Sequence, residues 1–177
     1  MATHHATMDR IAHPDTPGHR SLRHGRWSAP GQTYLITTTT AWRHRRLGHW
    51  ETGSAVARIV GDNTIWRQHT NHAWVLMPDH AHFLTTLGMD ETLAQLMARV
   101  KSVTSRAAHR VDPGAKTTFW QRSFHDHALR CEDHLAIAAR YIIANPVRAN
   151  LVDEVWQWPF WDSQWLPARG GDDLYIP

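Results

Sequence analysis

Two histidines, His80 and His82, lie one residue apart in the otherwise apolar segment AWVLMPDHAHFLTTL, residues 73–87. The residues after Pro78 predict a strand, in which side chains at i and i+2 share one face. Two imidazoles that project together suit two ligands of one divalent metal ion. A pair of surface or half-buried histidines fits the same spacing, and burying an imidazole without a partner costs free energy.

A tyrosine and an asparagine lie one helical turn apart in the later segment EDHLAIAARYIIANP, residues 132–146. Tyr141 and Asn145 share a face of the predicted helix, and Pro146 disfavours helical backbone at Asn145, which places the pair at the last turn. The amide oxygen of Asn is a usable ligand for a hard metal, and Tyr is a possible covalent nucleophile. Alternatively, Tyr141 belongs to the core and Asn145 marks the end of the helix.

Basic residues are concentrated in two parts of the chain. The net charge is only +3, yet residues 1–50 carry seven Arg against two acidic residues, and residues 91–150 carry nine Arg or Lys against five. Of the 19 basic residues 17 are Arg, which favours forked contacts with phosphate and predicts a polyanionic partner. GC-rich coding bias is the alternative. The later arginines, read as phosphate clamps or as a solvated face, are Arg122, Arg130, Arg140 and Arg148.

Length and composition indicate one intracellular domain. The 177 residues suit a single domain with a sizeable core. No apolar run approaches the roughly 20 residues needed to cross a bilayer, and the first residues show no signal core. Cys131 is the only cysteine, which excludes a disulfide framework or a Cys-rich zinc site within one chain. Most of the ten tryptophans are expected in the core, although some could stack on bases.

The hydrophobic pattern predicts an α+β fold. Strands are expected over residues 31–40, 73–77, 80–87 and 119–130, and helices over 51–69, 90–110 and 132–146, with Asp90 or Thr92 capping the second helix. This order is close to β-α-β-β-α-β, a ferredoxin-like antiparallel sheet with helices on one face, followed by a late helix that carries Tyr141. We expect a disordered, basic and His-rich arm over 1–25, the main domain over 26–152, and a packed Trp/Pro-rich extension over 153–177.

Five blocks of the sequence resemble one family. WVLMPDHAHFLTTL resembles the signature of the HUH single-tyrosine, IS200-like transposases. FWQRSFHDHALR and ARYIIANPVRANLV resemble the later blocks of one branch, the REP-associated tyrosine transposases, as do RWSAPGQTYLITTTT and WPFWDSQWL. The blocks follow in the family's order over about residues 26–166, and five ordered blocks are far more specific than any one of them.

The resemblance implies an HUH endonuclease fold and a set of site residues. His80 and His82 would bind Mg²⁺ or Mn²⁺, with Asn145 where relatives often carry Gln, and Tyr141 would be the nucleophile. The implied activity is single-stranded DNA cleavage and strand transfer at REP palindromic hairpins with an unpaired foot, through a covalent 5′-phosphotyrosine and without ATP. By proximity alone, the candidates for a general base are His125, Asp126 and His127.

Charge and resemblance together predict the DNA contacts, which are Arg23, Arg26, Arg99, Lys101, Arg106, Arg122, Arg130 and Arg148. The expected protein is cytoplasmic and nucleoid-associated, does not contact membranes, and is a monomer or a homodimer.

Two other functions remain open. One is a domesticated protein that binds REP hairpins without cutting them, which has no need of the complete set of histidines, tyrosine and asparagine. The other is an unrelated metallohydrolase, ranked last because its barrel needs roughly 250 residues.

Overall fold

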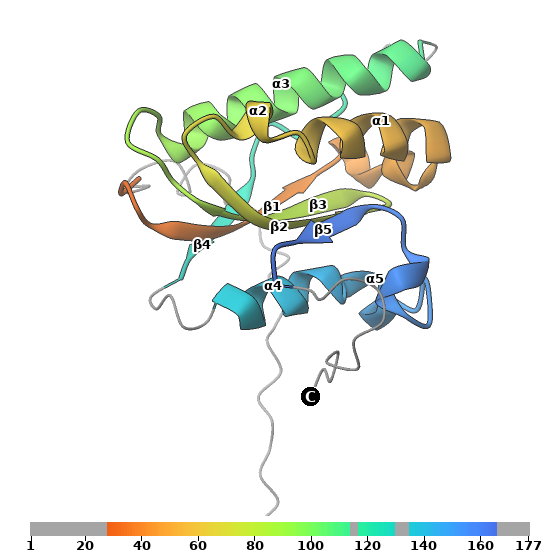
Figure 1. The fold of residues 1–177 in the computed structure, drawn as a ribbon. Coiled ribbons are helices and arrows are strands. Elements are labelled where there is room, and N and C mark those ends of the chain that lie inside the picture. Colours follow the sequence, from red (N-terminus) through yellow and green to blue (C-terminus); the bar gives the residue numbers. More distant parts are fainter. Residues whose placement is uncertain (1–27, 114–116, 130–134, 166–177) are drawn as a thin grey trace, which may run out of the picture.

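An antiparallel sheet forms the middle layer of the protein (Figure 1). The computed structural model describes residues 28–113, 117–129 and 135–165, so the arm expected over 1–25 lies outside the described residues. Within those ranges the sheet has five strands in the spatial order β4-β1-β3-β2-β5, and each neighbouring pair is antiparallel. The strands are β1 (Thr33–Thr39), β2 (Thr70–Met77), β3 (His80–Thr86), β4 (His125–Ala128) and β5 (Trp161–Ser163).

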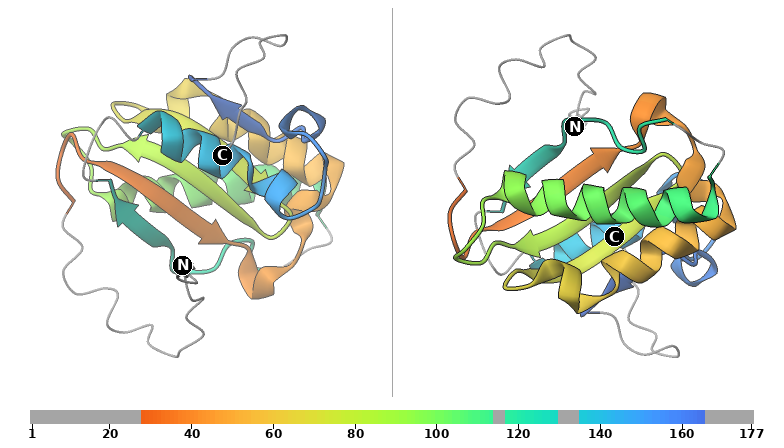
Figure 2. Two further views of the ribbon diagram at one scale, coloured as in Figure 1. Left: turned by 90° about the horizontal axis from the view of Figure 1, so that it is seen from below. Right: turned by 90° about the horizontal axis from the view of Figure 1, so that it is seen from above.

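Helices cover both faces of this sheet (Figures 1 and 2). One face carries α1 (Trp50–Val60), α2 (Asn63–Trp66) and α3 (Leu93–Val111), and the other carries α4 (Leu135–Ile143) and α5 (Asn145–Arg148). Short 3₁₀ turns lie at Ala41–Arg43, Arg46–Gly48 and Val155–Gln157. None of the described helices is long and apolar enough to cross a membrane.

Each face of the sheet has its own hydrophobic core, and β3 contributes to both. Ala81 and Phe83 are buried in the core beneath α1 and α3, whereas Leu84 is buried in the core beneath α4. Because side chains alternate along a strand, His80 and His82 share the face of Leu84. The two histidines therefore lie on the face that α4 covers, here called the α4 face.

The predicted ferredoxin-like α+β fold is confirmed, with the late helix on the opposite face from the other helices. Of the two proposed caps, Thr92 is the one observed: its hydroxyl accepts from the backbone N–H of Gln95, in a capping box. The helix predicted over 51–69 is wrong in extent, because Asp62 starts a separate helix after α1 has ended at Val60. The strand predicted over 119–130 is regular only in β4, with an isolated bridge at Trp120.

The end of the chain differs from the prediction in two places. Pro146 was expected to stop the late helix, but α4 already ends at Ile143 and Pro146 lies in the first turn of α5, where its missing N–H costs little. The Trp/Pro-rich extension, in which no strand is predicted, contains β5, which pairs with β2, and Phe160, which is buried in the core. The division of the chain at residues 25 and 152 stays a prediction.

Candidate metal and nucleophile site

The two histidines lie at the start of β3, directly after the turn at Pro78 and Asp79 that reverses the chain from β2. Their ring centroids are 4.8 Å apart, and the rings meet edge to face at 86°. The strand that the sequence predicts over 80–87 is observed, and it brings His80 and His82 together on one face, which is the α4 face. Two imidazoles at this separation form a compact pair of nitrogen donors.

Each histidine has a polar partner at its Nδ1 atom. The Oγ1 of Thr37, on β1 directly across from His82, lies 2.8 Å from His82 Nδ1. The Oδ1 of Asp79 lies 2.6 Å from His80 Nδ1, and the other carboxylate oxygen of Asp79 pairs with Arg43 at 3.2 Å. Partners at Nδ1 fix the tautomer and leave both Nε2 atoms for a ligand, the arrangement that supports metal-binding histidines.

The electrostatics keep His82 neutral. Burial lowers the pKa of His82 to about 3, and the positive charges of His80 and Arg148 add to this effect. The pKa of Asp79 is also lowered: burial opposes this shift, but the hydrogen bond with His80 and the contact with Arg43 outweigh it. His82 is therefore an uncharged imidazole at neutral pH, the form that binds metals, and Asp79 is an anion beside the pair.

Tyr141 lies on α4 with half of its surface exposed, at 51%. The guanidinium of Arg148, from α5, sits over the tyrosine ring with its Cζ 4.1 Å from the ring centroid. The same guanidinium is close enough to His82 to lower its pKa. Arg148 is thus the residue that links the tyrosine to the histidine pair, and all of them lie on the α4 face.

Asn145 is the first residue of α5 rather than a residue of α4. Its side-chain amide nitrogen donates to the backbone carbonyl of Ile142 at 2.8 Å and more weakly to that of Tyr141 at 3.5 Å. These bonds orient the amide and leave Oδ1 as the atom that could bind a metal. Among the described residues, no three His, Cys, Asp or Glu side chains group around a possible metal. Asn145 as the third ligand beside His80 and His82 stays a prediction.

The residues that support the histidines were not predicted from the sequence. Asp79 could have been, because it directly precedes His80. Thr37 is one of four consecutive threonines, and only the register of β1 against β3 shows that it faces His82. Of the candidate bases, His125 pairs with Thr37 and so lies two strands from His82 on the same face, about 10 Å away by ordinary strand spacing.

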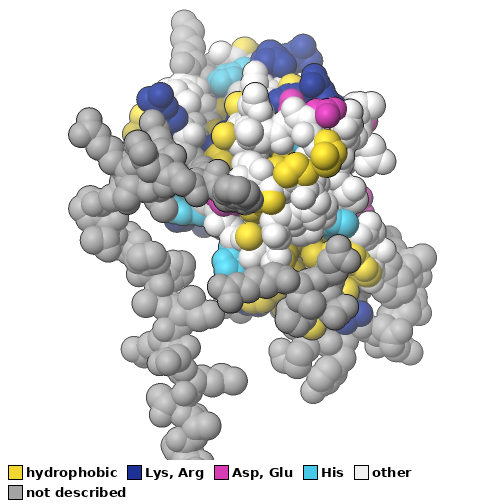
Figure 3. Space-filling model, turned by 90° about the vertical axis from the view of Figure 1, so that its left-hand side faces the viewer, with side chains coloured by type: hydrophobic (Ala, Val, Ile, Leu, Met, Phe, Trp, Pro, Cys, Tyr) yellow, Lys and Arg dark blue, Asp and Glu magenta, His cyan; other side chains and the backbone are white. Residues whose placement is uncertain are grey.

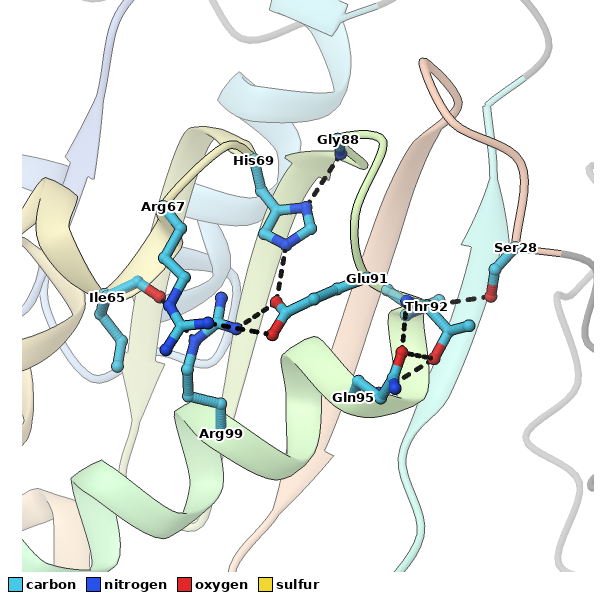
Figure 4. Close-up of polar contacts among 10 residues, drawn as sticks. Ser28, Ile65, Arg67, His69, Gly88, Glu91, Thr92, Gln95 and Arg99 are labelled. Atoms are coloured by element: carbon cyan, nitrogen blue, oxygen red, sulfur yellow. Dashed lines mark hydrogen bonds and ion pairs between the residues drawn. The ribbon is translucent and has the colours of Figure 1, made fainter.

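The predicted DNA contacts on α3 differ in their surroundings. Arg99 is largely buried, pairs with Glu91, and donates from Nε to the Ile65 carbonyl at 3.2 Å (Figure 4). Lys101 Nζ donates to two backbone carbonyls, those of Gln121 and Ser123. Both side chains hold parts of the fold together, and their contact with DNA stays a prediction.

The other predicted contacts are more exposed or lie outside the described residues. Arg106 is exposed and bonds Ser102 at 2.6 Å, while Arg122 and Arg148 are exposed. On the side drawn in Figure 3, Lys and Arg side chains gather toward the α1–α3 layer, with acidic side chains beside them. Arg23, Arg26 and Arg130 lie outside the described residues.

Known proteins are similar to this chain in both sequence and fold. The family model for IS200-like transposases matches residues 30–145. A REP-associated tyrosine transposase of Escherichia coli (strain K12) is 33% identical over 140 residues, which span 78% of this chain and 73% of the relative. A solved structure of a REP-associated tyrosine transposase bound to a REP hairpin has a TM-score of 0.59 and 26% identity, covering 78% of this chain and 81% of that one. The chain belongs to the IS200-like transposases, in the branch of the REP-associated tyrosine transposases.

Proposed function

We propose that this protein is a metal-dependent single-stranded DNA endonuclease and strand transferase that acts on REP palindromic hairpins. The observation that carries the proposal is the arrangement of Tyr141, half exposed with Arg148 over its ring, on the same face of the sheet as a partly buried pair of histidines whose Nδ1 atoms have polar partners. The similar solved structure is bound to a REP hairpin, which supports the same class of DNA as the partner. The protein would act on the chromosome, in the cytoplasm and at the nucleoid.

The reaction exchanges one phosphodiester for another. The Tyr141 hydroxyl oxygen attacks the phosphorus of the DNA strand, and the bond from phosphorus to the 3′ oxygen breaks. The phenol loses its proton, the leaving oxygen gains one, and the products are a 5′-phosphotyrosine and a free 3′-OH. A second 3′-OH that attacks the phosphotyrosine reverses the step and joins strands, so no ATP is consumed.

Each residue of the site has a separate task. Arg148 places a positive charge over the phenol ring, where it favours negative charge on the attacking oxygen and can contact the phosphate. His80, His82 and Asn145 would hold the divalent ion, which when bound supplies Lewis-acid stabilisation of charge on the phosphate oxygens. Two nitrogen ligands and one amide oxygen suit Mn²⁺ better than Mg²⁺, although cells supply more Mg²⁺.

A cleavage assay tests the proposal. The probe is an end-labelled hairpin strand with its unpaired flank, taken from the DNA beside the chain's own gene, incubated with protein and Mn²⁺ or Mg²⁺ and resolved on a denaturing gel. We expect metal-dependent cleavage that EDTA abolishes and that is lost in Tyr141→Phe while hairpin binding stays nearly intact. The matched control is Tyr34→Phe, because Tyr34 is buried in β1 beneath the other helix layer and should keep cleavage.

The other outcomes distinguish the alternatives. Cleavage that survives Tyr141→Phe would show a water nucleophile, and hence a plain metallonuclease. Tight hairpin binding without cleavage, across both metals and several hairpins, would identify a domesticated binding protein.

A further inference from the structure

A pocket of about 390 Å³ lies beside the end of β1, and of the residues assigned above only Arg122 lines it. It is open to the surface and lies between the turn after β1 and the segment before β4. Its size falls in the range of roughly 300–1,000 Å³ that is typical of small-ligand sites. The lining residues are Ala41, Trp42, Thr118, Trp120, Gln121, Arg122 and Ser123.

The pocket is built on rigid structure. The backbone N–H of Ala41 donates to the Phe119 carbonyl, and that of Gln121 donates to the Thr39 carbonyl, both at 2.9 Å. The buried Trp120 indole forms one wall and donates from Nε1 to Thr104 on α3 at 2.9 Å. These bonds lock the two segments together and hold the walls of the pocket in place.

An exposed tryptophan forms the rim. Trp42 is 69% exposed, and both it and Arg43 have left-handed backbone, with φ of 54° and 55°. Residues other than glycine rarely adopt this conformation, and two in succession are held in place by their surroundings, as happens at ligand-binding sites. An exposed indole plane at the mouth of a pocket is a surface on which a planar ring can stack.

One exposed cation lines the pocket. Trp42 begins the sequence WRHRR, residues 42–46, in which Arg43 pairs with Asp79 and Arg46 with Asp112, and the exposed Arg122 is among the lining residues. Among residues 28–113, 117–129 and 135–165, Arg122 has no acidic partner, so its guanidinium is available to an anion. Aromatic planes interleaved with arginines are the usual surface for a single nucleic-acid strand.

The pocket is close to the histidine pair. The backbone N–H of Thr40, the residue before the pocket, donates to the Asp79 carbonyl at 2.9 Å. Arg43, the residue after Trp42, pairs with the Asp79 carboxylate, which in turn bonds His80. The turn that contains Trp42 is therefore linked to His80 through Asp79.

We propose that this pocket binds an unpaired nucleobase of the DNA strand next to the scissile phosphate. The base stacks on the Trp42 indole, the side chains of Thr118, Gln121 and Ser123 face its polar edge, and Arg122 contacts the adjoining phosphate. The inference rests on the proposed function, because it takes single-stranded DNA to be the substrate. It assigns to Trp42 a part in selecting the unpaired nucleotides beside the hairpin.

The test is a binding measurement with full-length protein. The probe is the hairpin strand from beside the gene, in which the unpaired bases are replaced one at a time by an abasic site. In the wild type, one replacement should weaken binding roughly tenfold to a hundredfold, the usual effect of losing one stacked base. Trp42→Asn removes the indole while tolerating left-handed backbone, and it should weaken binding of the intact probe by a similar factor.

The decisive result is non-additivity. Trp42→Asn should no longer respond to the abasic replacement that matters to the wild type, and Trp42→Phe should retain most of the response. Trp50→Ala is the matched control, because Trp50 is 64% exposed and does not line the pocket. Its binding profile should match that of the wild type.

The failures are distinguishable. Two results with a wild type that binds the probes would show that the pocket inference is wrong while the proposed function stands. In one, Trp42→Asn binds every probe as the wild type does. In the other, the loss of affinity caused by Trp42→Asn adds to the loss caused by the abasic site. If the base effect depends on Trp42 but no cleavage occurs, the proposed chemistry is wrong and the pocket stands. If the wild type binds none of the hairpins, both are wrong.

Discussion

The contact between Thr37 and His82 leads to a quantitative prediction about metal affinity. A metal ion on His82 Nε2 requires an unprotonated Nε2, so the ring proton sits on Nδ1 and must be donated to an acceptor. The Thr37 Oγ1, 2.8 Å away, is that acceptor. Thr37→Val keeps the shape of the side chain and removes the oxygen, which leaves a buried N–H donor unpaired in the metal-bound state.

The expected size of the effect follows from the burial of His82. An unpaired donor in a buried position costs about 1–3 kcal/mol, which corresponds to metal binding roughly fivefold to a hundredfold weaker. This range agrees with the roughly tenfold to hundredfold losses usual for partners of metal-binding histidines. Titration calorimetry with Mn²⁺ on the DNA-free protein measures the change directly and does not depend on catalysis.

A neighbouring threonine is a matched control. Thr39 lies on the same strand and face as Thr37, directly across from His80, but the partner of His80 Nδ1 is Asp79. Thr39→Val should therefore change Mn²⁺ affinity by less than twofold. The reasoning is refuted if Thr37→Val binds Mn²⁺ as tightly as the wild type, or if both valine variants lose affinity equally.

Two predictions concern stability. Burial favours the neutral form of Glu91, but the hydrogen bond from Arg99 outweighs burial and lowers the pKa of Glu91 from 4.5. The ionised Glu91 therefore stabilises the fold fully above pH 4.5, and this stabilisation is lost as the pH falls through the lower pKa of the folded state. Urea unfolding should show a loss of stability below about pH 4.5 that is smaller in Glu91→Gln; an equal slope would contradict this assignment. At Gly53 an added Cβ would lie 2.5 Å from the Phe160 ring, so Gly53→Ala should lower the free energy of unfolding by about 1–3 kcal/mol in urea. Ser54→Ala on the same helix should change it little, because within the described residues the Ser54 hydroxyl is buried without a partner; similar losses in both variants would show that the ring contact is not the cause.

Local patterns were sufficient for the elements that contain the site. The strand alternation in β3 placed His80 and His82 on one face, and the Thr92 side chain marks the start of α3 as its capping role predicts. Elements whose formation depends on distant partners were less predictable. β5 has only three residues and exists because the edge of β2 accepts it, and no local signal in a Trp- and Pro-rich segment indicates that pairing.

In the candidate site, too, some residues could be predicted from local sequence patterns and others could not. The candidate metal ligands and the candidate tyrosine nucleophile stand out by residue type and spacing, because chemistry limits which side chains can act. Thr37 is an ordinary strand threonine until the register against β3 is known, and Arg148 reaches the Tyr141 ring only because a second helix follows α4. The Trp42 pocket joins segments about 80 residues apart in the chain, which sequence spacing alone does not reveal.

The central claim is that Tyr141 becomes covalently joined to DNA, and peptide mapping tests it most directly. The wild-type protein would be incubated with Mn²⁺ and the hairpin strand, digested with nuclease and protease, and examined by mass spectrometry for a tyrosine that carries a nucleotide 5′-phosphate. We predict the modification on the peptide containing Tyr141 and on neither of the other two tyrosines, Tyr34 and Tyr175. Cleaved DNA with an unmodified Tyr141, or with the phosphate on another residue, would contradict the account.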